Sequence, residues 1–146
     1  MEESSSRTMR IIDANINRAG EGLRVLEEVA RLVLNDADIS RQLKNMRHEM
    51  VKIDLSLQRQ FLRARNSEGD VGIDIEAAGE QKQKDLPTII VANSRRAQEA
   101  LRVLEELSKT PEINLDTEKF KKARFELYTI EKNLFSGLSG GDKASG

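Results

Sequence analysis

The hydrophobic residues of this chain recur every three or four positions along most of its length, which is the period of an amphipathic α-helix. Four such runs cover residues 8–34, 39–63, 85–109 and 116–137. The pattern therefore predicts four helices, each with one apolar stripe facing a common core. The stripe of the first run consists of Ile12, Ile16, Ala19, Leu23, Leu26, Ala30 and Leu34.

Turn and capping residues separate the four runs. Asn35 and Asp36 follow the first run, and Asp85 with Pro87 two residues later is typical of a helix start. Thr110-Pro111 ends the third run, and Gly137 ends the fourth. We therefore expect one helical domain, preceded by a short disordered segment and followed by a flexible tail. The expected bounds are 1–7 for the segment, 8–136 for the domain and 137–146 for the tail.

The first and third predicted helices contain the same eighteen-residue motif. Residues 11–28 read IIDANINRAGEGLRVLEE, residues 89–106 read IIVANSRRAQEALRVLEE, and 13 of 18 positions are identical at an offset of 78. Leucines alone would be enough to preserve a core face, but polar residues recur as well. These pairs are Asn15/Asn93, Arg18/Arg96, Glu21/Glu99 and Arg24/Arg102. Duplicated amide, guanidinium and carboxylate groups indicate two matched halves of one polar site.

The repeat continues into the second and fourth predicted helices. Arg47 matches Arg124, and Leu43-Lys44 matches Phe120-Lys121, now at an offset of 77. The repeating unit is therefore a helical hairpin. We expect an all-α fold in which two pseudo-symmetric hairpins form a four-helix, bundle-like domain. Repeat one is expected over 8–63, a loop over 64–84 and repeat two over 85–136.

Composition narrows the class of protein and its location. Charged residues make up 34% of the chain, aromatic residues 3%, and the net charge is −1. A near-neutral charge gives no general attraction for nucleic acid. The absence of cysteine fits a reducing compartment, and no apolar run is long enough to cross a membrane. We expect a cytoplasmic protein that binds neither nucleic acid nor membranes.

Several polar residues fall on the predicted apolar faces. Asn15 lies within the first stripe and Arg18 at its edge, while Arg47 and Arg124 lie on the apolar faces of their helices. A buried charge without a partner is costly, so an inward arginine must meet a carboxylate, water or a ligand anion. One interpretation is a set of structural pairs, Arg47–Asp54 and Arg124–Glu131, that fix helix register. The other is a central polar cleft with two anion-binding ends, lined by two asparagines and four arginines.

Other polar residues also have structural explanations. Asn15 and Asn93 could simply bond backbone groups, and His48, the only histidine, could lie on the surface. Gly22 is matched by Ala100, which favours close helix packing over ligand access as its role.

The run Gly69-Asp70-Val71-Gly72 has no counterpart in the second half. Glycines let a backbone approach a phosphate closely, Asp70 could hold Mg²⁺ or accept a proton, and Arg63 and Arg65 could supply positive charge. An ordinary surface turn is the alternative. The chain contains no GxxxxGK[ST], GxGxxG or HExxH motif, and its single histidine leaves no Ser-His-Asp candidate.

Four stretches resemble a small helical family linked to thiamine biosynthesis. They are residues 10–27, 43–48, 68–72 and 92–106, and the resemblance extends over about residues 9–135. Members of the family occur alone or fused ahead of a thiamine-phosphate synthase barrel. The resemblance implies a kinase that uses ATP and Mg²⁺ to phosphorylate 4-amino-5-hydroxymethyl-2-methylpyrimidine phosphate to the pyrophosphate.

For such a kinase we expect each half-site to hold one phosphate group and the 64–84 segment to close as a lid. The expected catalytic residues are Asp70, Arg47 and Arg96, with Asp70 also the metal ligand. The expected substrate- and phosphate-binding residues are Asn15, Arg18, His48, Arg65, Asn93 and Arg124.

The chain departs from the pattern expected of this family at three places. Arg65 is followed by Asn66 where an Arg-Asp pair is expected, which leaves more of any metal binding to Asp70. Lys82 stands near an expected arginine after Glu80, and Phe125 follows Arg124 where tyrosine is expected. These changes affect the expected metal ligands more than the reaction class.

Two other classes of function are consistent with the sequence. One is a non-catalytic module that binds a pyrimidine phosphate or scaffolds a thiamine-phosphate synthase. The other is a helical dimerisation module, although such a module would need only the repeated leucines. An apolar flank near Ile11, Val25 and Leu32 allows a homodimer without requiring one.

Overall fold

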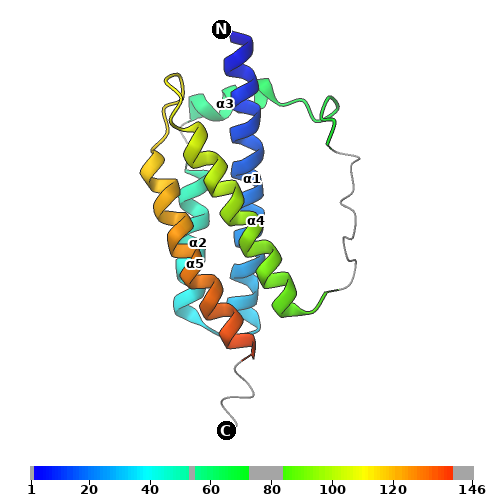
Figure 1. Ribbon diagram of the computed structural model, residues 1–146, viewed down its shortest axis with the longest axis vertical. Helices are drawn as coiled ribbons and strands as arrows, with labels where there is room; N and C mark the ends of the chain where they lie inside the picture. Colours follow the sequence, from blue (N-terminus) through cyan, green and yellow to red (C-terminus); the bar gives the residue numbers. More distant parts are fainter. Residues whose placement is uncertain (1, 53–54, 73–83, 140–146) are drawn as a thin grey trace.

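The computed structural model describes residues 2–52, 55–72 and 84–139, and the regular structure within these ranges is helical. The helices are α1 (Glu2–Leu32), α2 (Ala37–Val51), α3 (Leu55–Ala64), α4 (Leu86–Leu107) and α5 (Thr117–Ser139). Four of them run along the long axis of the molecule, and the short α3 lies across the end at which the chain begins (Figure 1). The expected all-α fold of two hairpins, α1–α2 and α4–α5, is confirmed.

The hairpins join along α1 and α4. α1 packs against α2 and α4, α4 packs against α5, and α3 covers part of α1. The core consists of the apolar stripes predicted from the sequence, because a helix buries its one hydrophobic face against its neighbours. Phe61 anchors α3 to this core. The largest fully buried side chains include Ile12, Leu23, Leu26, Leu43, Ile90, Leu101, Leu104, Leu127, Ile130 and Leu134.

Two predicted helix starts are formed by aspartate caps. The Asp36 carboxylate accepts a hydrogen bond from the backbone N–H of Ile39 at 3.0 Å, and that of Asp85 accepts one from Thr88 at 2.9 Å. Each cap satisfies a backbone donor that has no partner within its helix. Asn35, between α1 and α2, has a φ of 53°, a left-handed conformation that asparagine tolerates and that helps to reverse the chain.

Three predicted boundaries need correction. The predicted helix 39–63 is two helices, α2 and α3, with residues 53–54 between them outside the described residues. α1 begins at Glu2 rather than Thr8, so most of the segment expected to be disordered is helical; glutamate and serine cost a solvated helix little. α5 ends at Ser139 rather than Gly137. Residues 73–83 of the predicted 64–84 lid and residues 140–146 of the predicted tail lie outside the described residues.

The apolar flank expected to allow a homodimer is only partly exposed. Ile11 and Leu32 are exposed, whereas Val25 is half-buried. A homodimer stays a prediction.

α1 and α4 come into close contact at Gly22. A Cβ atom on Gly22 would lie 2.9 Å from the backbone oxygen of Asn93 and 3.3 Å from the Cβ of Ala97. Gly20, two residues earlier, has no atom within 4 Å of its Cβ position. The structure therefore supports the packing interpretation of Gly22.

We expect Gly22→Ala to lower the free energy of unfolding by about 1–3 kcal/mol, because an added methyl must push α1 away from the α4 backbone. Gly20→Ala is the matched control and should raise that free energy by up to about 1 kcal/mol through helix propensity. Urea unfolding of both variants measures the difference. Equal stability of the two variants would mean that the α1–α4 contact is looser than described.

Candidate anion-binding site

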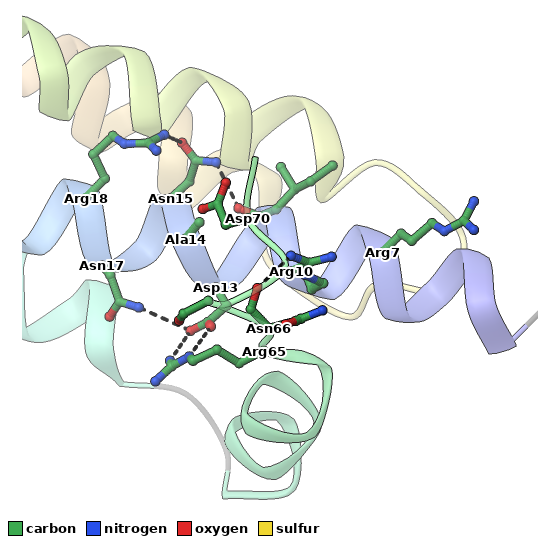
Figure 2. Close-up of a pocket in the computed structure, with 12 residues that line it drawn as sticks. Arg7, Arg10, Asp13, Ala14, Asn15, Asn17, Arg18, Arg65, Asn66 and Asp70 are labelled. Carbon is green, nitrogen blue, oxygen red and sulfur yellow. Dashed lines mark hydrogen bonds and ion pairs between the residues drawn. The ribbon is translucent and has the colours of Figure 1, made fainter. Parts of the chain in front are cut away.

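A cleft of about 580 Å³ lies between the first half of α1 and the segment that follows α3. Figure 2 shows the polar side chains that face it. Its lining contains four arginines but only two aspartates, so its charge favours an anionic ligand. The lining residues are Arg7, Arg10, Ile11, Asp13, Ala14, Asn15, Asn17, Arg18, Arg65, Asn66, Ser67 and Asp70.

An asparagine orients the arginine one turn further along α1. The buried Asn15 amide donates to the backbone oxygen of Ile11 at 2.8 Å, and its Oδ1 accepts from Nη1 of Arg18 at 3.0 Å (Figure 2). Among the described residues no carboxylate pairs with Arg18. Its remaining N–H groups are therefore available to a ligand.

The same arrangement occurs in α4. Asn93 donates to the backbone oxygen of Ile89 at 2.9 Å and accepts from Arg96 at 3.3 Å. The backbone bond expected of both asparagines is thus confirmed. In both repeats the asparagine thus links the arginine to the helix backbone.

A second group of bonds ties the segment after α3 to α1. Nε and Nη2 of Arg65 donate to the two carboxylate oxygens of Asp13 at 2.9 and 2.7 Å. Asn17 donates to the same carboxylate at 3.2 Å, and Arg10 donates to the backbone oxygen of Asn66 at 3.0 Å. The hydrogen bond from Arg65 to Asp13, and then the negative charge of Asp13, raise the pKa of the Arg65 guanidinium above its ordinary value.

The segment after Arg65 is held in a turn by its own side chains. Asn66 Oδ1 accepts from the backbone N–H of Gly69 at 2.8 Å, and Asp70 Oδ1 accepts from that of Gly72 at 2.9 Å. The Asp70 bond forms an Asx-turn, and in both bonds a side chain replaces a backbone acceptor. A Cβ on Gly69 would collide with the Asn66 side chain, which would then have to move from its position in this turn. The turn places Asp70 in the lining of the cleft.

The inward arginines of the second and fourth predicted helices form ion pairs across their hairpins. Arg47 donates to Glu27 at 2.8 Å, and Arg124 donates to Glu105 at 2.9 Å. Glu27 and Glu105 are both buried and occupy equivalent positions in the repeat, so the duplicated unit contains a duplicated ion pair to a buried glutamate.

The expected partners of these arginines need correction. Glu131 does not pair with Arg124; it accepts hydrogen bonds from Ser94 and Gln98, and Arg124 also donates to the hydroxyl of Tyr128 at 2.9 Å. Asp54, the expected partner of Arg47, lies outside the described residues.

The single cleft with two equivalent ends is not present in the described part of the chain. The cleft brings together Asn15, Arg18, Arg65 and Asp70. The other expected site residues do not line it. Arg47 forms its ion pair between α1 and α2, and His48 is exposed on α2. On α4, Arg96 is exposed and the backbone of Asn93 lies beside Gly22. Arg124 borders a separate hollow of about 670 Å³ over α4 and α5.

Sequence reasoning missed Arg10, Asp13 and Asn17, although a signal was available. Asp13 and Asn17 are two of the five positions at which the eighteen-residue repeats differ; Asp13 bonds Arg65, and Asn17 bonds Asp13. Two further differences, Ser94 and Gln98, together hold Glu131. Four of the five differences between the repeats thus fall where one half forms polar contacts that the other half lacks.

The residues of the cleft fit a magnesium ion with few protein ligands. Within the described ranges no three His, Cys, Asp or Glu side chains group to hold a metal, and the carboxylate of Asp13 is engaged by Arg65. Mg²⁺ usually keeps several waters and takes one or two carboxylates plus substrate phosphates. Asp70 alone is compatible with that kind of site.

The fold and the cleft define a small all-helical domain with an internal repeat and a polar, arginine-lined cleft. No described helix is long and apolar enough to span a membrane. The chain belongs to the ThiD2 family, which matches residues 10–133.

Curated relatives associate this family with thiamine biosynthesis. The chain is 40% identical over 142 residues to a thiamine-phosphate synthase of Rhodopirellula baltica, a match covering 96% of the chain and 38% of the relative. It is 38% identical to a thiamine-phosphate synthase of Nostoc punctiforme over 91% of the chain and 37% of the relative. The chain thus spans less than two fifths of the length of these relatives. No solved structure gives a significant match.

Proposed function

We propose that this chain is an ATP-dependent kinase that phosphorylates 4-amino-5-hydroxymethyl-2-methylpyrimidine phosphate to the pyrophosphate in thiamine biosynthesis. One observation carries the proposal: Arg18, without a carboxylate partner, and the Asp70 carboxylate line the same arginine-rich cleft. Guanidinium groups recognise phosphate oxygens with directed, charge-assisted hydrogen bonds. Family membership and the thiamine-phosphate synthase relatives support the same pathway.

The reaction requires positioning and charge neutralisation more than acid–base chemistry. An oxygen of the substrate phosphate forms a bond to the γ-phosphorus of ATP, the bond from that phosphorus to the β,γ-bridging oxygen breaks, and ADP leaves. The attacking phosphate oxygen is already anionic near neutral pH, since the second pKa of a phosphate monoester is about 6. The lining of the cleft contains no histidine, which is consistent with a reaction that needs no strong base.

Four residues of the cleft have a proposed role. Arg18, held by Asn15, binds phosphate oxygens, and Arg10 adds positive charge where α1 meets the turn. Asp70 is the proposed ligand of Mg²⁺, which would neutralise phosphate charge when bound. Roles for Arg47, His48, Asn93, Arg96 and Arg124 stay predictions.

Turnover of the purified chain tests the proposal. With ATP, Mg²⁺ and the pyrimidine monophosphate, we expect one ADP and one pyrimidine pyrophosphate to form for each pyrimidine monophosphate consumed. A coupled assay measures the ADP, and mass spectrometry identifies the pyrophosphate product. ATP alone should be hydrolysed far more slowly. Absence of pyrophosphate product at high enzyme concentration would overturn the kinase proposal.

The non-catalytic alternative rests on the length of the relatives. Because the chain covers only 38% of the Rhodopirellula baltica synthase, the domain accompanies a larger region there and could deliver a pyrimidine phosphate to it. Binding of the pyrimidine monophosphate without turnover would favour this carrier role over the kinase.

A further inference from the structure

We propose that Asp13 is a positioning residue that holds Arg65, and through it the Asn66–Gly72 turn, over the cleft, and that Arg65 acts through this pair rather than by binding phosphate. The proposal rests on the proposed kinase function for its kinetic consequences, but its structural part can be tested separately.

The Asp13–Arg65 pair lies at the joint between α3 and the turn. Arg65 is the first residue after α3, and its backbone N–H still donates to the oxygen of Phe61 at 3.0 Å. Phe61 fixes the helix through apolar burial, but the turn after Arg65 contains only exposed residues. The Arg65–Asp13 pair and the bond from Arg10 to the Asn66 oxygen tie this joint to α1.

The bonding of Arg65 argues against direct phosphate binding. Its Nε and one Nη both donate to the Asp13 carboxylate. These are the two donors with which an arginine binds a phosphate in bidentate fashion. Asp13 is only 7% exposed, so releasing Arg65 to a ligand would leave a nearly buried carboxylate without its main partner. In Figure 2 the Arg65 guanidinium lies on the side of Asp13 that faces away from Arg18 and Asp70.

The internal repeat distinguishes Asp13 and Asn17 from the residues that both halves share. Position 91, the equivalent of Asp13, is valine, and position 95, the equivalent of Asn17, is arginine. The second repeat thus forms its helix with neither the carboxylate nor the amide at these positions. Helix formation and core packing therefore do not by themselves require Asp13 or Asn17, and the contact with Arg65 gives them a role in the first half.

Placement of the turn matters because it carries Asp70. Asp70 lies five residues beyond Arg65, and its carboxylate shares the cleft with Asn15 and Arg18. A displacement of about 1 Å in a positioning group can reduce a reaction rate by about 100-fold, even when the altered residue does not touch the reacting atoms.

A double-mutant cycle of Asp13→Asn and Arg65→Gln tests the proposal kinetically. If the two residues act only as a pair, each single variant should lower kcat by about 10- to 100-fold, and the double variant should be no worse than the poorer single. KM for the pyrimidine monophosphate should change by less than about threefold in all three. A large KM increase confined to Arg65→Gln, or additive losses in kcat, would overturn the proposal because Arg65 would then contact the substrate.

Hydrogen exchange provides a readout that does not depend on catalysis. We expect the amides of Gly69 and Gly72 to exchange at least about tenfold faster in Asp13→Asn, while the core amides of α4 and α5 keep their wild-type rates. Arg41→Gln, which removes an exposed pair with Asp38, is the control and should change neither set. Unchanged exchange at both glycines in Asp13→Asn would contradict the structural part. A wild-type chain without turnover would instead contradict the kinase proposal alone.

Discussion

Arg18→Ala is expected to lower kcat/KM for the pyrimidine monophosphate by about 100-fold. Arg18 faces the cleft without a carboxylate partner, and a hydrogen bond to a charged group contributes about 1.5–3 kcal/mol. Stability should hardly change, because the side chain is exposed and bonds only Asn15 in the described structure. Steady-state kinetics with varied pyrimidine phosphate and varied ATP would show which of the two substrates Arg18 contacts.

Two comparison variants sharpen this experiment. Arg24→Ala removes an exposed arginine of the same helix that pairs with Glu28, and should leave kcat/KM within about twofold of wild type, as surface pairs contribute little. Arg96→Ala removes the equivalent of Arg18 in the second repeat, which does not line the cleft. A wild-type kcat/KM in Arg18→Ala would refute the site. Equal losses in Arg18→Ala and Arg96→Ala would instead support the two-half-site arrangement expected from the sequence.

Glu105→Gln is expected to lower the free energy of unfolding by about 3 kcal/mol, because removing one partner of a buried ion pair leaves an uncompensated charge. Glu105 is 5% exposed and Arg124 8% exposed, and two guanidinium nitrogens of Arg124 bond Glu105 Oε1 at 2.9 and 3.2 Å. Urea unfolding monitored by circular dichroism at pH 7 measures the loss. Glu106→Gln is the matched control: its carboxylate is exposed, and the variant should stay within about 0.5 kcal/mol of wild type.

The same ion pair predicts a pH dependence of stability. Burial alone would raise the pKa of the Glu105 carboxyl, but the hydrogen bond and charge of Arg124, with the charges of Arg102 and Lys109, bring it below its usual value of 4.5. A carboxyl with a lowered pKa in the folded state adds stability above its unfolded pKa and loses it as the pH falls. The advantage of wild type over Glu105→Gln should therefore be full at pH 7 and shrink below about pH 4.5. A difference that stays constant down to pH 3 would contradict this account.

The polar network around Glu131 shows why the partners of buried charges were mispredicted. Helical periodicity correctly placed Arg124 on an inward face, and one interpretation paired it with Glu131, a carboxylate on the same face of its own helix. In the structure Arg124 reaches across the hairpin to Glu105 on α4, while Glu131 bonds Ser94 and Gln98. A sequence pattern reports the face on which a side chain lies. Which residue of a neighbouring helix it meets depends on helix separation and rotation, and these are properties of the packed molecule.

The break between α2 and α3 has a similar cause. Ile39, Leu43, Met46, Met50, Leu57 and Phe61 all fit one helical stripe. The structure nevertheless ends α2 at Val51 and places α3 across the end of the bundle, where Phe61 packs into the core. No proline or glycine marks this break, so local sequence contains little signal for it.

The sequence by itself determined the helical hairpins, their duplication, most of the core and the presence of inward asparagines and arginines, because these follow from periodicity along a single chain. Only the tertiary structure decided which arginines are neutralised and which remain available. It paired Arg47 and Arg124 with glutamates of the neighbouring helices and left Arg18 facing a cleft. The reason is physical: the state of a charged side chain depends on groups brought near it by packing, and those groups are distant in sequence.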